Sequence, residues 1–172
     1  MPLTQDQRSQ VVNQTNFWIA KASALYGRVL TPIDVRFDLR GKTSGMFCVK
    51  KTGFKYTRYI RYNDRIFARY FSENIEQTIP HEVAHYTVYE MFGRSAKPHG
   101  SEWRKVMQDF GVSAAVTSKL DVDDLATRKL KRFIYRCACG ERELTSIRHN
   151  RIQRGARNYG CPRCKQILEF IG

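Results

Sequence analysis

One stretch constrains this chain more than any other: residues 78–93 read TIPHEVAHYTVYEMFG, with two histidines four residues apart. On an α-helix, residues four apart lie on one face, so the imidazoles of His81 and His85 can reach the same metal ion. Glu82 lies about 100° further round the helix, which places its carboxylate beside that ion rather than on it. Such a glutamate suits a general base that takes a proton from zinc-activated water. The pattern therefore predicts a helix that carries a hydrolytic zinc site.

A catalytic zinc site uses three protein ligands and leaves one position open. The next histidine along the chain, His99, follows His85 by fourteen residues. A turn that begins at Gly93 can bring His99 back to the helix. The sequence therefore predicts His99 as the third ligand, with Glu102 or Asp109 as alternatives.

Periodic apolar residues predict the secondary structure around this motif. Helical spacing predicts helices at about residues 4–27, 74–92 and 102–111. Alternating apolar and polar residues predict strands at residues 31–40, 46–51 and 55–63. Pro80 would either kink the second helix or begin its principal segment. Together these elements predict an α+β fold, with helices packed on a small, mostly antiparallel sheet that has one covered face.

Four of the five cysteines form two close pairs near the C-terminus, Cys137 with Cys139 and Cys161 with Cys164. In a chain without an export signal, such pairs indicate a structural zinc site held by four thiolates rather than disulfides. The 21 residues between the pairs suffice for two strands that return the chain to its start, as in a zinc ribbon. Because C-x-C is a tight spacing, His149 remains an alternative ligand in place of Cys137.

Positive charge is concentrated in the C-terminal part of the chain. Residues 127–172 contain 12 Lys/Arg and 3 Asp/Glu, whereas residues 1–126 contain 18 and 13. Such a field favours a polyanion, and nucleic acid is the commonest one inside cells. Between the cysteine pairs, arginine recurs at every third position and a tyrosine closes the run: Arg148, Arg151, Arg154, Arg157 and Tyr159. Arginine binds phosphates and an aromatic ring supports unpaired bases, so this run is predicted to contact DNA, preferentially single-stranded.

The sequence leaves an alternative to this interface open. The less favoured interpretation of the arginine run is a solvated face on the ribbon that contacts nothing. In that case, DNA would be expected at the basic residues of the second and third strands: Lys50, Lys51, Lys55 and Arg58.

Length and charge also suggest how the chain is organised. Its 172 residues fit one domain with a small appendage, and the change in charge places the boundary between residues 1–126 and 127–172. The polar N-terminus lacks the apolar region of a secretory signal, and no run approaches the roughly 18 apolar residues of a membrane span. We therefore expect a soluble, cytoplasmic, DNA-associated monomer that does not contact membranes.

Three segments together resemble a known family. They read IPHEVAHYTVYEMFG, KPHGSEWRKVMQDFG and YRCACGERELTSIRHNRIQRGARNYGCPRCKQILEF. The order of H-E-x-x-H, H-G-x-x-W and the paired cysteines is similar to the SprT family of zinc-metalloprotease-like proteins, which includes the Spartan-type proteases that remove proteins crosslinked to DNA. The resemblance implies a zincin-like fold, zinc bound by His81, His85 and His99, and a catalytic Glu82. It also implies that the strand around Tyr56–Asn63 borders the cleft.

The sequence thus predicts a zinc metalloendopeptidase that cleaves proteins bound or crosslinked to DNA. It predicts two zinc ions per chain, one catalytic and one structural. We expect low activity without DNA, because the charge and the resemblance both suggest that substrate is delivered by tethering. Two other functions stay open: a nucleic-acid-binding zinc protein with an inactive protease site, and a hydrolase that attacks the nucleic acid itself.

Overall fold

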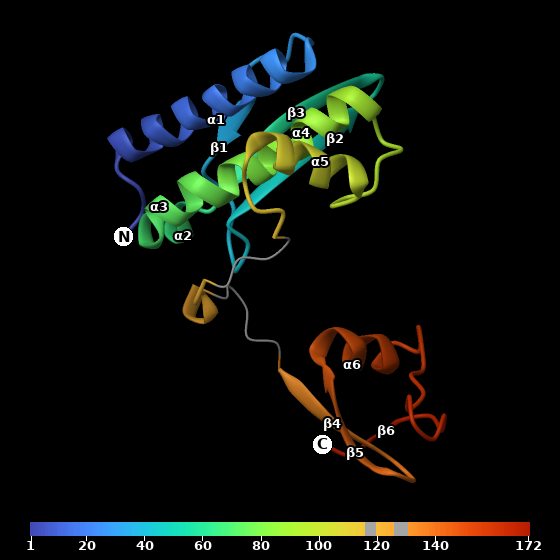
Figure 1. Ribbon diagram of the computed structural model, residues 1–172. Helices are drawn as coiled ribbons and strands as arrows, with labels where there is room; N and C mark the ends of the chain where they lie inside the picture. The colour runs from blue at the N-terminus through green and yellow to red at the C-terminus, as the bar shows by residue number, and fades with distance from the viewer. Residues whose placement is uncertain (116–119, 126–130) are drawn as a thin grey trace. The chain divides into compact units, whose positions relative to one another are not determined.

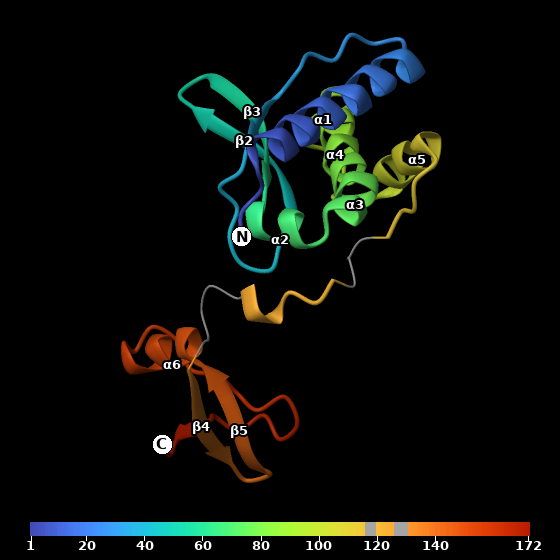
Figure 2. The same ribbon diagram turned by 90° about the vertical axis from the view of Figure 1, so that its left-hand side faces the viewer.

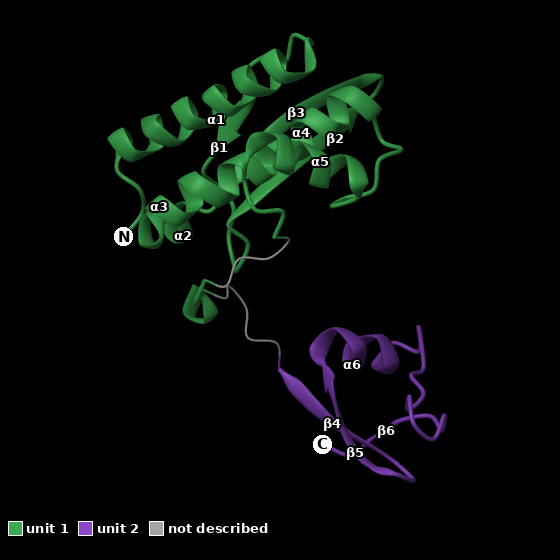
Figure 3. Cartoon of the chain, in the orientation of Figure 1, with its two compact units in different colours: residues 1–127 green, residues 128–172 purple. Residues whose placement is uncertain are grey.

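The structure, a computed structural model, describes residues 1–115, 120–125 and 131–172. It divides into two compact units, Met1–Thr127 and Arg128–Gly172, which Figure 3 shows in different colours. The boundary expected from the sequence lies after residue 126. No helix among the described residues is both long enough and apolar enough to cross a membrane.

A three-stranded sheet forms one layer of unit 1. Its strands are β1 (Asp34–Arg36), β2 (Gly45–Thr52) and β3 (Lys55–Tyr62), in the order β1-β3-β2. β2 runs antiparallel to β3 over eight residue pairs, and β1 runs parallel to β3 over three. The first predicted strand is therefore much shorter than residues 31–40. Because β3 is central, β2 forms an edge with which no other described strand pairs.

Helix α4, which carries the H-E-x-x-H motif, lies at the centre of unit 1. The helical elements are α1 (Gln5–Tyr26), α2 (Asp64–Arg69), α3 (Phe71–Glu73), the π-helical turn η1 (Asn74–Thr78), α4 (Ile79–Phe92), α5 (Ser101–Phe110) and the 3-10 turn η2 (Asp123–Leu125). Figures 1 and 2 show α4 between α1 and α5, with the sheet alongside. Pro80 lies in the first turn of α4, directly after η1, where the chain changes from π-helical to α-helical. The proline therefore marks the start of the α-helical segment within a longer helical run.

The sequence prediction misses α2, which follows β3 directly. Asn63 caps this helix, because its side-chain oxygen accepts hydrogen bonds from the backbone N–H groups of Arg65 at 3.2 Å and Ile66 at 3.4 Å. The helix buries Ile66 and Phe67 against the core. With only six residues, α2 is too short to show a helical period in the sequence.

One apolar core joins the sheet to the helices of unit 1. Ile60 and Tyr62 of β3 are fully buried, and the ring of Phe67 lies 4.8 Å from that of Tyr62. On the other side of α4, α5 buries Trp103 completely. Burying side chains of this size contributes roughly 1.5–3 kcal/mol each. Unit 1 thus has a core of its own, in which residues of α4 take part.

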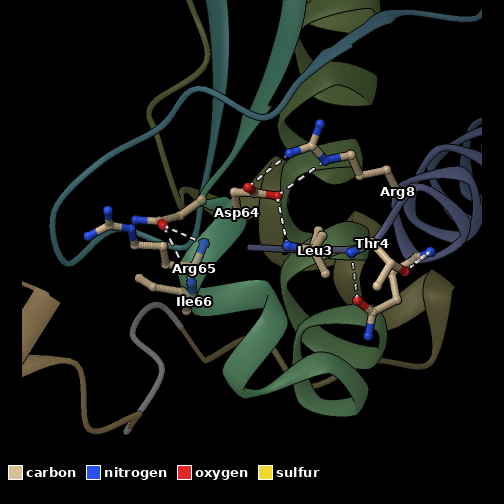
Figure 4. A network of polar contacts seen from close by, with 8 residues as sticks. Leu3, Thr4, Arg8, Asp64, Arg65 and Ile66 are labelled. Atoms are coloured by element: carbon tan, nitrogen blue, oxygen red, sulfur yellow. Dashed lines mark hydrogen bonds and ion pairs between the residues drawn. The ribbon is translucent and has the colours of Figure 1, made fainter. Parts of the chain in front are cut away.

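A buried carboxylate ties the N-terminal segment to α2. Asp64 accepts hydrogen bonds from the Leu3 backbone N–H at 3.2 Å and from the Arg8 guanidinium at 2.9 Å, as Figure 4 shows. Thr4 and Gln7 form a capping box at the start of α1. These contacts fix the position of α1, which packs against α4.

Unit 2 is a small sheet with one helix. Its elements are β4 (Arg132–Cys137), β5 (Gly140–Thr145), α6 (Ser146–Gln153) and β6 (Glu169–Phe170), and the strands pair antiparallel in the order β5-β4-β6. Its core of buried residues is small: Tyr135, Leu144, Cys161 and Leu168.

Helix α6 differs from the prediction of two strands between the cysteine pairs. On this helix, His149 and Ile152 lie three positions apart and therefore share a face. Ile152 packs on the small core, and the His149 ring stacks on Phe133 with centroids 3.7 Å apart. The arginine run was expected to lie on a ribbon of strands. Its first two members, Arg148 and Arg151, lie on α6 instead, where a spacing of three places them on neighbouring turns.

Candidate metal centres and cleft

Three histidines of unit 1 converge on one point. His81 and His85 lie on α4, and His99 lies in the loop before α5. Their Nε2 atoms are 3.2 Å apart for His81 and His85, and 3.0 Å apart for each pair that includes His99. The backbone of His99 has a φ of 56°, a left-handed conformation that is uncommon for a residue other than glycine. This conformation accompanies the turn that brings His99 back to α4.

Trp103 supports all three histidines. Its ring centroid lies 4.7 Å from those of His81 and His99, and 5.6 Å from that of His85. Its indole N–H donates to the backbone carbonyl of His81 at 3.4 Å. The sequence identifies Trp103 as an apolar residue of the following helix and as the last residue of the H-G-x-x-W motif, but it assigns Trp103 no role beside the histidines. Its place behind the triad depends on how α5 packs on α4, and no local pattern reveals that packing.

The histidine group fits a metal such as zinc. Three nitrogens bound tetrahedrally to zinc would lie roughly 3.3 Å apart, close to the separations found here. Burial, with a smaller effect of the neighbouring histidines, lowers the pKa of His85 to about 3 and that of His81 to about 4. The two imidazoles are therefore neutral at physiological pH, as a metal ligand must be.

The alternative third ligands lie elsewhere. Among the described residues, the group of potential ligand atoms contains the three histidines and neither Glu102 nor Asp109. Asp109 instead accepts hydrogen bonds from the Tyr26 hydroxyl at 2.7 Å and from Lys105 at 3.1 Å. Glu102 accepts one from the Ser101 hydroxyl at 3.2 Å.

Glu82 points from α4 to the edge of the sheet. Its side chain is buried, and Oε2 accepts a hydrogen bond from the backbone N–H of Phe47 at 2.7 Å. Burial raises the pKa of Glu82 to about 7, although this hydrogen bond acts in the opposite direction. β2 comes this close because residue 45 is glycine: a Cβ there would lie 2.8 Å from Cγ of Glu82 and 2.7 Å from Cγ2 of Thr78.

β2 presents open backbone groups to a cleft beside this site. The Asn63 N–H donates to the Ser44 carbonyl, so residues 44 and 63 form a hydrogen-bonded pair. Because such pairs alternate along an antiparallel ladder, residues 46, 48, 50 and 52 of β2 also bond to β3. The backbone groups of residues 45, 47, 49 and 51 therefore point to the edge. The Phe47 N–H already donates to Glu82, so the backbone groups of Val49 and Lys51 are the next ones along the edge that another strand could bond.

A cavity of about 400 Å³ lies along this edge. Its lining includes Phe47 and Val49 of β2, His85 and Val88 of α4, and Trp103. The strand around Tyr56–Asn63, which was expected to border the cleft, reaches the cavity only through Tyr56, because β3 is the central strand of the sheet. β2 occupies the bordering position instead.

The four paired cysteines of unit 2 also converge. Cys137, Cys139, Cys161 and Cys164 are free thiols whose sulfur atoms all lie within 4.8 Å of one another. Backbone N–H groups lower the pKa of Cys161 to about 6 and also lower that of Cys164, which favours the thiolate at these two positions. The pKa of Cys137 is raised instead, because a backbone hydrogen bond that lowers it is outweighed by burial and by the other three thiols. Four sulfurs at this spacing could hold zinc in a closed site.

His149 lies apart from this cysteine cluster. Its Nδ1 is 3.0 Å from the Tyr135 hydroxyl, and its ring is stacked on Phe133. Cys137 itself belongs to the cluster. The geometry therefore gives no support to His149 as a substitute for Cys137.

The predicted DNA-contacting residues of unit 2 gather around Tyr159. The guanidinium carbons of Arg148 and Arg157 lie 5.5 and 5.8 Å from the centre of its ring, and Arg151 donates to its hydroxyl at 3.5 Å. Arg154 is the C-cap of α6. We call these five residues the arginine–tyrosine cluster. The structure brings Arg148, Arg151 and Arg157 together at one ring, although the residues span helix and loop.

Comparison with known proteins identifies the family of the chain. Residues 14–123 match the SprT-like family. Protein SprT of Vibrio parahaemolyticus is 36% identical over 155 residues, which cover 90% of this chain and 88% of the relative. Protein SprT of Actinobacillus succinogenes is 34% identical over 165 residues, covering 95% and 91%. No solved structure matches the chain significantly. With a family match over most of unit 1 and relatives aligned along nearly the whole length, this chain belongs to the SprT-like family.

Proposed function

We propose that this protein is a zinc metalloendopeptidase with a zincin-like fold, and that it cleaves proteins bound or crosslinked to DNA. The observation that carries the proposal is the convergence of three histidines, together with the buried Glu82, which follows His81 on the same helix. His81, His85 and His99 would hold the zinc. When bound, the zinc would polarise a peptide carbonyl and make water more acidic.

Glu82 is the proposed general base. Its pKa of about 7 allows the carboxylate to exchange a proton near neutral pH, which is the range where a general base works best. The Phe47 N–H holds Oε2, so the carboxylate has one oxygen fixed while Oε1 remains for the reaction. Glu82 would accept the proton of the attacking water and pass it to the leaving amine.

The proposed substrate is an extended peptide segment along β2. The open backbone groups of Val49 and Lys51 can pair with such a segment as an added strand would. The adjacent cavity, with apolar walls from Phe47, Val88 and Trp103, can receive a side chain. A folded protein offers few extended segments, so unstructured regions of the substrate are the expected targets.

Unit 2 is the proposed DNA anchor. Its four cysteines would hold a second zinc ion, and the arginine–tyrosine cluster would bind phosphates and stack on an unpaired base. The strong positive charge of residues 127–172 supports this role. Activity would then depend on DNA, because the anchor raises the local concentration of a tethered substrate.

A DNA–protein conjugate with a separate label on each component tests the proposal. The wild-type protein loaded with zinc should cut the protein component and leave the DNA intact, and His99→Ala should abolish this cleavage. A cut in the DNA alone would indicate a nuclease. Tight binding without any cut would indicate a nucleic-acid-binding protein with an inactive site.

A further inference from the structure

The hairpin formed by β2 and β3 carries positive charge without acidic residues. Residues 45–62 contain five Lys/Arg and no Asp/Glu. Two of these cations are neutralised by residues outside the hairpin: Arg58 pairs with Glu90 at 2.8 Å, and Arg61 pairs with Asp38 at 2.7 Å. The other three are Lys50, Lys51 and Lys55, which are exposed and form no ion pair with any described residue.

An aromatic ring stands at the tip of this hairpin. Phe54 is fully exposed, at 103% of its reference surface, and it follows Gly53, whose φ of 60° makes the tight turn. Thr52 and Lys55 face each other across the turn, so lysines flank the ring on both sides in the sequence. In Figures 1 and 2, the hairpin tip lies at the periphery of unit 1. Phe54 therefore contributes nothing to the core.

The opposite side of the cleft carries two further cations. Arg94 and Lys97, in the loop between α4 and α5, are exposed and line the same cavity as Lys51 and Tyr56. Among the described residues, none that lines this cavity is acidic. The cleft is thus bordered at this end by cations from two separate segments, with an exposed ring on one of them.

This combination of groups suits a single-stranded nucleic acid. Lysines distributed along a strand can follow a phosphate backbone, and an exposed ring can stack on any unpaired base. An acidic peptide would also be attracted by the lysines, but it would give no role to a ring that projects from the turn. In duplex DNA the bases are already stacked on one another, so the ring would gain little.

We propose that the tip of the β2–β3 hairpin, with Phe54 at its centre and Lys50, Lys51 and Lys55 around it, binds single-stranded DNA next to the cleft. Arg94 and Lys97 extend the surface across the cleft mouth. This inference rests on the proposed function and deepens it by giving unit 1 its own DNA contact. A peptide attached to a nucleotide held at the tip would begin at the open end of the edge strand.

Binding of the full zinc-loaded chain to a fluorescein-labelled oligodeoxythymidine, measured by anisotropy over a series of salt concentrations, tests the proposal. The variant Lys50→Gln/Lys51→Gln/Lys55→Gln should flatten the salt slope of log affinity by about 2, at about 0.7 for each phosphate that the variant no longer neutralises. The control Arg28→Gln/Arg40→Gln/Arg65→Gln removes the same charge from exposed positions of unit 1 and should leave the slope unchanged.

The ring has its own test. Phe54→Ala should weaken binding of the oligonucleotide by about fivefold or more, the effect expected for one stacked base, while Phe54→Tyr should bind as wild type does. Affinity for a blunt duplex should change little in both. All the substituted side chains are exposed, so thermal unfolding should match that of the wild type.

Two results would overturn the inference: a lysine variant with the salt slope of its control, or Phe54→Ala with wild-type affinity. Loss of affinity for a polyglutamate peptide but not for the oligonucleotide would instead identify a peptide-recognition surface. The two proposals fail separately. If the zinc-loaded wild type leaves DNA-tethered protein uncut, the proposed protease activity is refuted, whereas weaker oligonucleotide binding by these variants would still uphold the DNA contact at the hairpin tip.

Discussion

The histidine site and the cysteine site differ in what holds their ligands in place. His81 and His85 lie on a helix within a core of seventeen buried apolar residues, whereas the cysteines lie in a unit whose core has four. One of those four, Cys161, is itself a potential ligand. We therefore expect the scaffold of the histidine site to fold without metal, and the cysteine unit to depend on metal for much of its stability. This contrast suits a catalytic centre and a structural one.

Loss of its metal should unfold unit 2 but leave unit 1 folded. Cys161→Ser should lose the metal of unit 2 and unfold that unit, since structural zinc contributes on the order of 10 kcal/mol to small domains. His99→Ala should lose the other metal and leave unit 1 folded. Hydrogen exchange followed by mass spectrometry would show reduced protection in β4 and β5 for the first variant and retained protection in α4 for both. Unfolding of α4 in His99→Ala would contradict the comparison.

The buried Glu82 should make the metal-free scaffold sensitive to pH. Its pKa is raised from 4.5 to about 7, so folding disfavours the charged form, and stability should fall as the pH rises from about 4.5 to 7. The full effect, present above pH 7, is about 3 kcal/mol. The lowered pKa values of His81 and His85 act oppositely, because their contribution is lost as the pH falls below 6.5.

The difference between Glu82→Gln and wild type isolates the glutamate from the histidines. In chelator, the variant should gain stability relative to wild type between pH 5 and pH 8, as measured by urea denaturation. A difference that does not change with pH would mean that the Glu82 carboxylate is solvated and that β2 does not pack closely against it.

Gly45→Ala should damage the contact between α4 and β2. The new methyl group would lie 2.8 Å from Cγ of Glu82, which forces the carboxylate or the strand to move. We expect overpacking to lower the free energy of unfolding by about 1–3 kcal/mol. Peptidase activity per folded molecule should also fall, because the Glu82 carboxylate is displaced. Met46→Ala, which removes a partly exposed side chain from the next residue of β2, is the control and should retain activity.

Substitutions in the arginine–tyrosine cluster should flatten the salt slope of DNA binding less than the triple lysine variant of the hairpin does. Arg151→Ala with Arg154→Ala should flatten the salt slope on single strands by about 0.7 for each phosphate that is no longer neutralised. The same variant should cleave DNA-tethered protein poorly and a free unstructured peptide as slowly as wild type. Equal losses on both substrates would indicate damage to the fold rather than to delivery.

Local patterns predicted which side chains converge, but not which residues surround them. The spacing of His81 and His85 fixes their common face, and the two cysteine pairs indicate their cluster, because both are short-range features. The hydrogen bond from Phe47 to Glu82 depends instead on the register of β2. The position of Trp103 depends on how two helices pack. Neither the strand register nor the helix packing produces a repeating pattern of residues that the sequence would show.

Unit 2 shows the same limit in another form. A repeat of three in the arginine run fits a ribbon, a loop or a helix, and the prediction of strands is wrong for α6. The contacts that decide it, between His149 and Phe133, join residues sixteen positions apart in sequence. In a short segment with few buried residues, too few apolar positions are present for their spacing to distinguish a helix from a strand.

Peptidase activity of Glu82→Gln tests the central claim most directly, because this substitution removes the base and keeps all three histidines. The zinc-loaded variant should cleave DNA-tethered protein at least about a hundredfold more slowly than wild type, the effect expected for loss of a general base. Its zinc content and its affinity for single-stranded DNA should equal those of the wild type. Cleavage at the wild-type rate by a variant with full zinc content would contradict the assignment of Glu82 and the catalytic role of the histidine site.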